Sequence, residues 1–361
     1  MGQMLSRRVR ELLGEQVEYP FARSVREIKA RKIIKLSSNE NPLGPSPKAV
    51  EAIKRESKRV NVYPDPKAEK LRMAISRYLG VDRECVIVGN GSDELVDLVC
   101  KAFMDPGDEV LIPLPTFSEY ELACRINGGR PRFIELRDFK WDGDVLAREL
   151  REARLAFIGR PNNPTGNSIS EDELEKLLAT GKLVVVDEAY AEFADYSIVD
   201  KIRMCDNLLI LRTFSKAFGL AGLRVGYGLG SRELIRALDR VRAPFSVSTL
   251  AQEAAVAALG DKLFLRRVKN MVKDGREYLQ RELPKLGLRV LPSDANFIMA
   301  NVSGLGTDAP AFCHFLAQRG ILIRDLSRFR GAGSDWVRIS VGTPKQNKRL
   351  VSMIKRYKGD G

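Results

Sequence analysis

A lysine that follows two hydroxyl-bearing residues is the first group in this sequence that could do covalent chemistry. Residues 213–219 read TFSKAFG and directly follow an apolar run at 208–211. A lysine at a strand end, beside hydroxyl groups and small residues, can form a Schiff base with a carbonyl cofactor. Arg224, eight residues after Lys216, adds a cation that can bind a phosphate group. Since most lysines are simply solvated, this stretch needs support from other motifs.

A carboxylate at the end of a second apolar run gives the first support. Residues 184–190 read VVVDEAY, which places Asp187 at the mouth of a predicted sheet. A buried carboxylate without a partner is costly, and a protonated pyridine nitrogen would be a suitable partner. Tyr190 could then hydrogen-bond a phenolate oxygen on the same ring. The alternative is that Asp187 caps the next helix, as aspartate often does, and these residues alone favour neither interpretation.

Two polar loops complete the set of groups. Residues 89–94 read GNGSDE, and small residues with exposed amides at a helix N-terminus can cradle a phosphate. This loop lacks the Gly-Lys-Ser/Thr ending of a Walker loop, and by itself a helix cap is the simpler interpretation. Residues 160–166 read RPNNPTG, where the Asn163 amide could contact a ring oxygen, although Asn-Pro turns are common.

The elements that must position these groups are strands of a parallel sheet. Apolar runs predict strands at residues 84–88, 109–113, 155–159, 183–187 and 208–211. The runs are continuous rather than alternating, which is typical of parallel strands covered by helices on both faces. Ligands bind beyond the carboxyl ends of such strands. All four loops fall there, and independent coincidence is a poor explanation for a lysine, a carboxylate, a phosphate cradle and ring-oxygen donors in one place.

The pattern changes after Pro244. A long helical region at 249–286 precedes β-like runs at 295–302, 321–324 and 337–341, which predicts a smaller α+β domain. The first 45 residues are charged and then loop-like, and we expect them to form an arm that packs on the small domain or on a second subunit.

Composition narrows the function classes. The net charge is +13, but the basic residues are spread along predicted helices and mixed with acidic ones. This charge distribution favours a positive surface potential that attracts phosphorylated small molecules, rather than a nucleic-acid-binding site. The single histidine, His314, argues against a histidine triad or a multi-histidine metal site, and five scattered cysteines predict reduced thiols in a cytoplasm. We find neither a signal-peptide pattern nor an apolar run near the ~20 residues of a membrane span.

Taken together, these motifs resemble those of the fold-type I pyridoxal-phosphate-dependent aminotransferases, class II subfamily, and among them the histidinol-phosphate aminotransferases. The resemblance runs from Tyr19 to Thr343, with NPTG at 163–166, DEAY at 187–190 and SKAFGLAGLR at 215–224 in the family's order and spacing. It implies an α/β fold with a mostly parallel seven-stranded sheet between helices, plus the smaller α+β domain. The expected bounds are 1–45 for the arm, 46–244 for the large domain and 245–361 for the small domain.

The resemblance also implies how pyridoxal 5′-phosphate is bound. Lys216 would hold it as a Schiff base and act as the base, with Asp187 on the pyridine nitrogen and Tyr190 and Asn163 on the ring oxygen. Phe117 would stack on the ring, where the family often has a tyrosine. The residues implied for the cofactor phosphate are Ser92, Asp93, Thr213, Ser215 and Arg224. Tyr63 would reach the phosphate in the partner subunit's site, which makes the active unit a homodimer.

On the substrate side, the resemblance implies transfer of the amino group of L-histidinol phosphate to 2-oxoglutarate, giving imidazole acetol phosphate and L-glutamate in histidine biosynthesis. The implied substrate contacts are Tyr19, Asn41, Asn163, Arg324 and Arg338, with both arginines on the phosphate. Alternatives of the same fold are an aromatic amino-acid aminotransferase and a threonine-phosphate decarboxylase. An alternative of another class is a nucleic-acid-binding regulator, which we disfavour because the chain leaves no room for a DNA-reading module.

Overall fold

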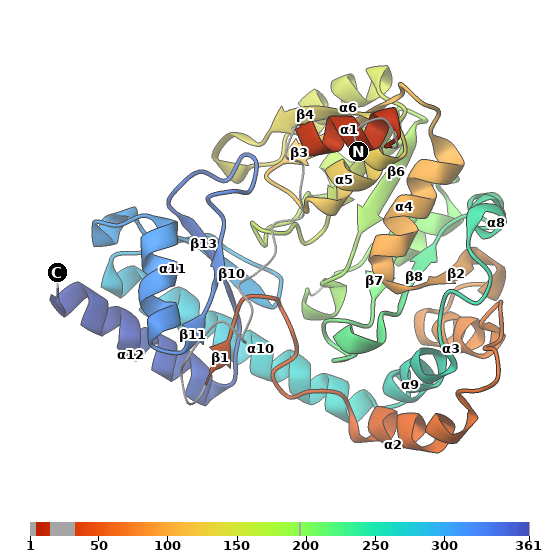
Figure 1. The fold of residues 1–361 in the computed structure, drawn as a ribbon. Coiled ribbons are helices and arrows are strands. Elements are labelled where there is room, and N and C mark those ends of the chain that lie inside the picture. The colour runs from red at the N-terminus through yellow and green to blue at the C-terminus, as the bar shows by residue number, and fades with distance from the viewer. Residues whose placement is uncertain (1–4, 15–32, 195, 361) are drawn as a thin grey trace.

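A seven-stranded sheet forms the centre of the larger part of the protein (Figure 1). The computed structural model describes residues 5–14, 33–194 and 196–360. The strands lie in the order β2 (Val86–Gly89), β8 (Gly226–Leu229), β7 (Leu208–Thr213), β6 (Leu183–Asp187), β5 (Leu155–Gly159), β3 (Glu109–Leu114) and β4 (Arg130–Glu135). β8 runs antiparallel to both neighbours, and all other pairs are parallel. This arrangement confirms the predicted α/β class and the mostly parallel sheet.

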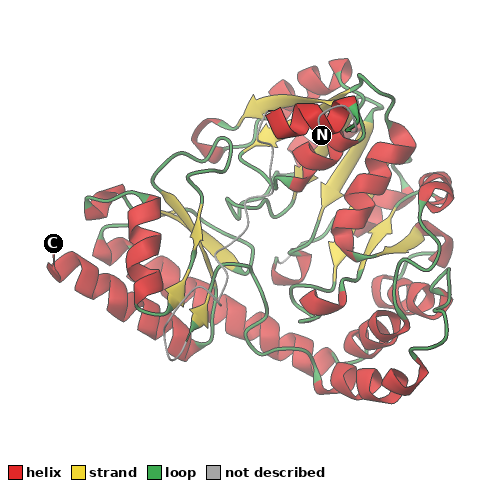
Figure 2. Cartoon of the chain, in the orientation of Figure 1, coloured by secondary structure: helices red, strands yellow, loops and turns green. Residues whose placement is uncertain are grey.

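Helices cover both faces of this sheet (Figure 2). Val185 packs in one apolar core, while Val184 and Val186 pack in another, because successive residues of a strand point to opposite faces. The first core lies under α4 (Gly91–Phe103), α5 (Glu119–Ile126) and α8 (Arg232–Val241). The second lies under α2 (Pro47–Glu56), α3 (Glu69–Leu79), α6 (Gly143–Glu152), α7 (Glu171–Leu178) and α9 (Thr249–Leu259).

A smaller sheet with its own core carries the C-terminal part of the chain. Its antiparallel strands lie in the order β12 (Arg324–Asp325), β13 (Trp336–Ser340), β10 (Phe297–Asn301) and β9 (Arg289–Val290). The accompanying helices are α10 (Lys262–Glu282), α11 (Ala309–Gln318) and α12 (Pro344–Asp360). Of the helices described, none is long and apolar enough to cross a membrane.

The N-terminal segment contacts both parts. α1 (Arg7–Gly14) lies on α5, where the Arg8 guanidinium donates to the Ile126 carbonyl at 3.1 Å. Further on, β1 (Ile34–Lys35) pairs in parallel with β11 (Ile321–Leu322), and the Leu36 carbonyl accepts from the Ser340 amide at 2.9 Å. Residues 33–39 are therefore held by C-terminal strands, which brings the loop after them close to the large sheet.

Several predicted elements differ from the observed ones. β4 and β8 were not predicted, because β4 carries a proline and charges tolerated at a sheet edge and β8 is glycine-rich. Gly226 is needed there, since a Cβ atom would lie 2.6 Å from the Ser92 amide nitrogen. The run 84–88 begins as a strand only at Val86. The run 321–324 is divided between β11 and β12, which belong to different sheets.

The helical region predicted at 249–286 is also interrupted. It forms α9, α10 and a short 3-10 turn, and the break comes at Gly260, after which Asp261 caps α10. The buried alanines of α9 pack in the core of the large sheet. The domain bounds stay a prediction.

Candidate functional site

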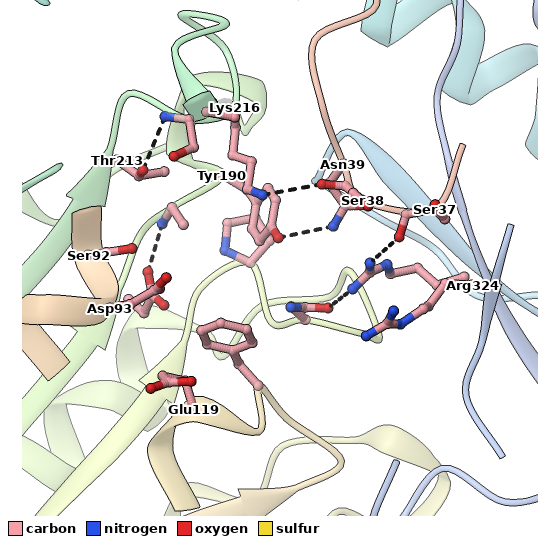
Figure 3. A pocket seen from close by; sticks show the side chains of 18 of the residues that line it. Ser37, Ser38, Asn39, Ser92, Asp93, Glu119, Tyr190, Thr213, Lys216 and Arg324 are labelled. Carbon is pink, nitrogen blue, oxygen red and sulfur yellow. Dashed lines mark hydrogen bonds between the residues drawn. The ribbon is translucent and has the colours of Figure 1, made fainter. Parts of the chain in front are cut away.

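A cavity of about 880 Å³ opens at the carboxyl ends of the parallel strands (Figure 3). Loops that follow β2, β3, β5, β6 and β7 form one side, and β12 and β13 of the smaller sheet contribute the other. Twelve of the residues proposed from the sequence line it: Ser92, Asp93, Phe117, Asn163, Asp187, Tyr190, Thr213, Ser215, Lys216, Arg224, Arg324 and Arg338. The tertiary structure thus brings residues from distant parts of the chain to one place.

Lys216 is a half-buried lysine in this cavity. Its Nζ atom donates to the Ser38 carbonyl at 3.4 Å and lies 5.9 Å from the centre of the Tyr190 ring. Burial, and secondarily the positive charge of Arg338, lowers the pKa of Lys216 to about 8. A substantial fraction of the amine is therefore neutral and nucleophilic at mildly alkaline pH.

Asp187 is a buried carboxylate at the end of β6. Its Oδ2 atom accepts from the Tyr120 hydroxyl at 2.7 Å, and its Oδ1 atom accepts from the Ala189 amide at 3.0 Å. Burial raises the pKa of Asp187 to about 6, against the lowering effect of these two hydrogen bonds. No basic side chain among the described residues forms an ion pair with it. The site therefore suits a ligand that brings a positive charge to this carboxylate.

The N-terminus of α4 and the loop after β7 form a polar cradle. Arg224 donates to the Asp93 carboxylate at 2.9 Å and to the Ser215 hydroxyl at 3.3 Å. The Thr213 hydroxyl accepts from the Ser215 amide at 3.1 Å. Gly91 has a φ of +83°, and a Cβ atom there would lie 2.7 Å from the Arg224 guanidinium. Helix-terminal amides, hydroxyls and a guanidinium together suit a phosphate group.

Tyr190 is held by a residue that the sequence analysis did not select. Its hydroxyl accepts from the Asn39 side-chain amide at 3.0 Å (Figure 3). Asn39 is fixed in turn by Ser340, whose hydroxyl both donates to the Asn39 Oδ1 atom at 2.8 Å and accepts from its backbone amide at 2.9 Å. The segment after β1 and strand β13 therefore orient the Tyr190 hydroxyl.

Two buried arginines face the cavity from the smaller sheet. Arg324 and Arg338 are direct cross-strand partners on β12 and β13, and each is 6% exposed. Arg338 donates to the side-chain Oδ1 atom of Asn163 and, at 2.9 Å, to the backbone carbonyl of Ser37. Two guanidinium groups on one wall of the cavity can together bind an anionic ligand group through paired hydrogen bonds.

Two described residues proposed from the sequence, Tyr63 and Asn41, do not line this cavity. Tyr63 is 80% exposed and stacks on Phe245 with ring centres 4.8 Å apart. The Asn41 amide donates to the Ala217 carbonyl at 2.9 Å, so within the subunit Asn41 supports the loop that carries Lys216. Tyr19 lies outside the described residues.

The cavity lining also includes residues that were not proposed from the sequence, among them Asn39, Tyr120 and Glu119. Asn39 stands in the loop NENP at 39–42, where Asn41 was chosen instead, and the signal that could have separated them is long-range pairing with Ser340. Tyr120 and Glu119 follow Phe117 at the start of α5, where a tyrosine in an amphipathic helix is indistinguishable from a core residue. Within the described part of the chain, no cluster of three or more His, Cys, Asp or Glu side chains could hold a metal ion.

Comparison with known proteins gives the aminotransferase family that the sequence motifs resemble. A family model for aminotransferase class I and II matches residues 31–354. A histidinol-phosphate aminotransferase of Methanosarcina mazei is 41% identical over 365 residues, which cover 97% of this chain and 98% of the relative. One of Methanopyrus kandleri is 42% identical over 347 residues, which cover 91% of this chain and 89% of the relative.

Solved structures of similar fold include a member of the same family. The histidinol-phosphate aminotransferase from Sinorhizobium meliloti, in complex with pyridoxal-5′-phosphate, aligns with a TM-score of 0.87 at 26% identity. The alignment covers 99% of this chain and 98% of that chain. The chain belongs to the aminotransferase class I and II family.

Proposed function

We propose that this protein is a pyridoxal-phosphate-dependent aminotransferase that moves the amino group of L-histidinol phosphate to 2-oxoglutarate in histidine biosynthesis. The observation that carries the proposal is the composition of one cavity. A half-buried amine, Lys216, and a buried carboxylate, Asp187, share it with the cross-strand pair of Arg324 and Arg338. The names of the full-length relatives supply the substrate.

The residues of the cavity fit the cofactor. Asp187 needs a positive charge, and a protonated pyridine nitrogen supplies one. The cradle around Arg224 offers hydrogen-bond donors to a phosphate, and Gly91 leaves the space that the Arg224 guanidinium occupies. Phe117 lies in the cavity wall, where its ring can stack on a planar ligand. Pyridoxal phosphate, when bound, supplies an aldehyde for the amino group and a ring that withdraws electrons from the reacting carbon.

The residues then have distinct roles. Lys216, neutral above its pKa of about 8, binds the cofactor and moves the proton between the two carbons that flank the transferred nitrogen. Asp187 keeps the ring nitrogen protonated, and Tyr190 and Asn163 orient the ring oxygen. Arg324 and Arg338 bind the substrate phosphate in one half of the reaction and a carboxylate of 2-oxoglutarate in the other.

An absorbance experiment tests this function. The purified protein should show a yellow cofactor band that disappears when histidinol phosphate is added and returns with 2-oxoglutarate. A yellow protein that is indifferent to histidinol phosphate but responds to phenylalanine or to threonine phosphate would support the two alternatives of the same fold. A colourless protein that takes up no added cofactor would contradict the proposal altogether.

Lysine substitutions at the arginine pair test the phosphate site. We expect Arg324→Lys and Arg338→Lys each to raise KM for histidinol phosphate by about tenfold to a hundredfold, because lysine cannot make the paired hydrogen bonds of a guanidinium. L-Histidinol, which lacks the phosphate, is the matched control. The loss should be far smaller with histidinol, and an equal loss with both compounds would show that the arginines do not bind the phosphate.

We also propose that the active unit is a homodimer in which Tyr63 completes the partner's cofactor site. Its support is an exposed apolar surface at Val60, Val62, Tyr63 and Phe245, which are 65%, 54%, 80% and 41% exposed. Tyr63→Ala subunits and Lys216→Ala subunits should each be inactive alone and regain activity when mixed. In the mixed dimer, one site receives both Lys216 and a partner Tyr63. Absence of any recovery in verified mixed dimers would contradict the shared site.

The compartment belongs to the same proposal. We propose the cytoplasm, supported by five cysteines that form no disulfide with one another. The nucleic-acid alternative has no specific observation in its favour, and salt-dependent binding of duplex DNA would be needed to revive it.

A further inference from the structure

The acidic residues of the cavity differ in which groups balance their negative charge. Three of them line it: Asp93, Glu119 and Asp187. Asp93 is paired with Arg224 at 2.9 Å. Asp187 accepts two hydrogen bonds and faces the ring-nitrogen position of the proposed cofactor. Glu119, in contrast, forms neither a hydrogen bond nor an ion pair with any described residue, although it is half-buried.

The surroundings of Glu119 leave its carboxylate able to accept a hydrogen bond from a ligand. It is the first residue of α5, two residues after Phe117, and lies near Asp93 and Asp97 of α4. Asp97 already accepts from Lys101 at 2.6 Å and from the Asn127 amide at 2.8 Å. Burial, with a smaller effect of Asp93 and Asp97, raises the pKa of Glu119 to about 7. A half-buried acid of this kind is stabilised by a ligand that donates a hydrogen bond or carries a positive charge.

The geometry of the cavity indicates which ligand group that is. If the substrate phosphate lies on Arg324 and Arg338, and its amine lies at Lys216, its ring must occupy the part of the cavity that the cofactor and these two groups leave free. Figure 3 shows Glu119 and Asp93 on the wall across the cavity from Arg324. An imidazole has an N–H donor and a pKa of about 6.5, close to that of Glu119, so the two can share a charge-assisted hydrogen bond.

We propose that Glu119 is a specificity-determining residue that accepts a hydrogen bond from the imidazole N–H of histidinol phosphate. This inference rests on the proposed function. It explains discrimination against both alternatives of the same fold: a phenyl ring offers no donor and leaves the half-buried carboxylate unsatisfied, and the carboxylate of threonine phosphate would be repelled.

Substrate comparison in Glu119 variants tests the proposal. Glu119→Ala should lower kcat/KM for histidinol phosphate by about tenfold to a hundredfold, mainly through KM, since a ground-state contact is lost. Glu119→Gln should retain part of the activity, because its amide oxygen still accepts a hydrogen bond. The reaction with glutamate, which has no imidazole, should change by less than about twofold. The ratio of activity on histidinol phosphate to activity on phenylalanine should fall accordingly.

Two controls separate the possible failures. Glu121→Gln alters a carboxylate of the same helix that pairs with Arg125 and Arg330 outside the cavity lining, and it should leave the substrate ratio unchanged. Unchanged histidinol-phosphate kinetics in Glu119→Ala, or an equal loss with glutamate, would overturn the role of Glu119 while leaving the proposed function intact. A wild-type protein that binds the cofactor but does not react with histidinol phosphate would overturn the proposed function and this inference with it.

Discussion

Lys216→Ala is expected to abolish amino transfer, lowering kcat by at least about a thousandfold, because one side chain both binds the cofactor covalently and moves the proton. Its Nζ atom lies in the cavity, near the Ser38 carbonyl and 5.9 Å from the centre of the Tyr190 ring. The measurement is steady-state formation of glutamate from histidinol phosphate and 2-oxoglutarate, together with the absorbance spectrum of the bound cofactor.

Two further results make this prediction specific. Cofactor phosphate binding should survive in Lys216→Ala, because the cradle of Arg224, Ser215 and Thr213 is untouched. Lys216→Arg should be equally inactive, since a guanidinium keeps its proton and cannot act as the base. Near-normal turnover in either variant would remove Lys216 from the mechanism.

Asp187→Asn is expected to have the second-largest effect, a loss of about a hundredfold to a thousandfold in kcat. The asparagine has nearly the same shape but no charge, so the ring nitrogen of the cofactor would no longer be held in its protonated form. Tyr120→Phe is the matched control, since it removes only the 2.7 Å hydrogen bond to Asp187 and should cost much less. A variant Asp187→Asn with wild-type kcat would contradict the assigned role.

Although Asp187→Asn should lower activity, it should raise the stability of the folded protein when the cofactor has been removed. The pKa of Asp187 is about 6 in the folded chain against an ordinary value of 3.8, so the folded state binds the extra proton between these values. The stability of the folded state therefore falls as the pH rises from 3.8 through 6. Above pH 6 the buried carboxylate is charged, and the full loss of stability is present. Above that pH, Asp187→Asn should stabilise the stripped protein by on the order of 1–3 kcal/mol.

Thermal unfolding of the stripped proteins on either side of pH 6 measures this effect. The variant should unfold at a higher temperature than the wild type above pH 6, and the two should converge as the pH falls toward 4. A pH-independent difference would mean that the buried charge is not the cause. An active site that is destabilised without its ligand is the expected consequence of placing an unpaired carboxylate in an apolar sheet.

Local sequence patterns were sufficient for the groups that stand at strand ends. Continuous apolar runs predicted β5 and β6 with their observed bounds, and parallel strands bring their carboxyl ends to one edge of the sheet. Lys216, Asp187 and Asn163 could therefore be placed together before any tertiary contact was known. β8 could not be predicted in this way, since its Gly226 is required by close approach of the Ser92 backbone rather than by strand propensity.

The sequence by itself determined the class of chemistry, and only the tertiary structure decided what holds the reactive groups in place. Lysine, aspartate and their flanking residues carry their chemistry in their own side chains, so type and spacing reveal them. The partners Tyr120 and Asn39 act through hydrogen bonds to Asp187 and Tyr190 across 67 and 151 residues of chain. Contacts of that range depend on how helices and sheets pack, and no local pattern encodes them.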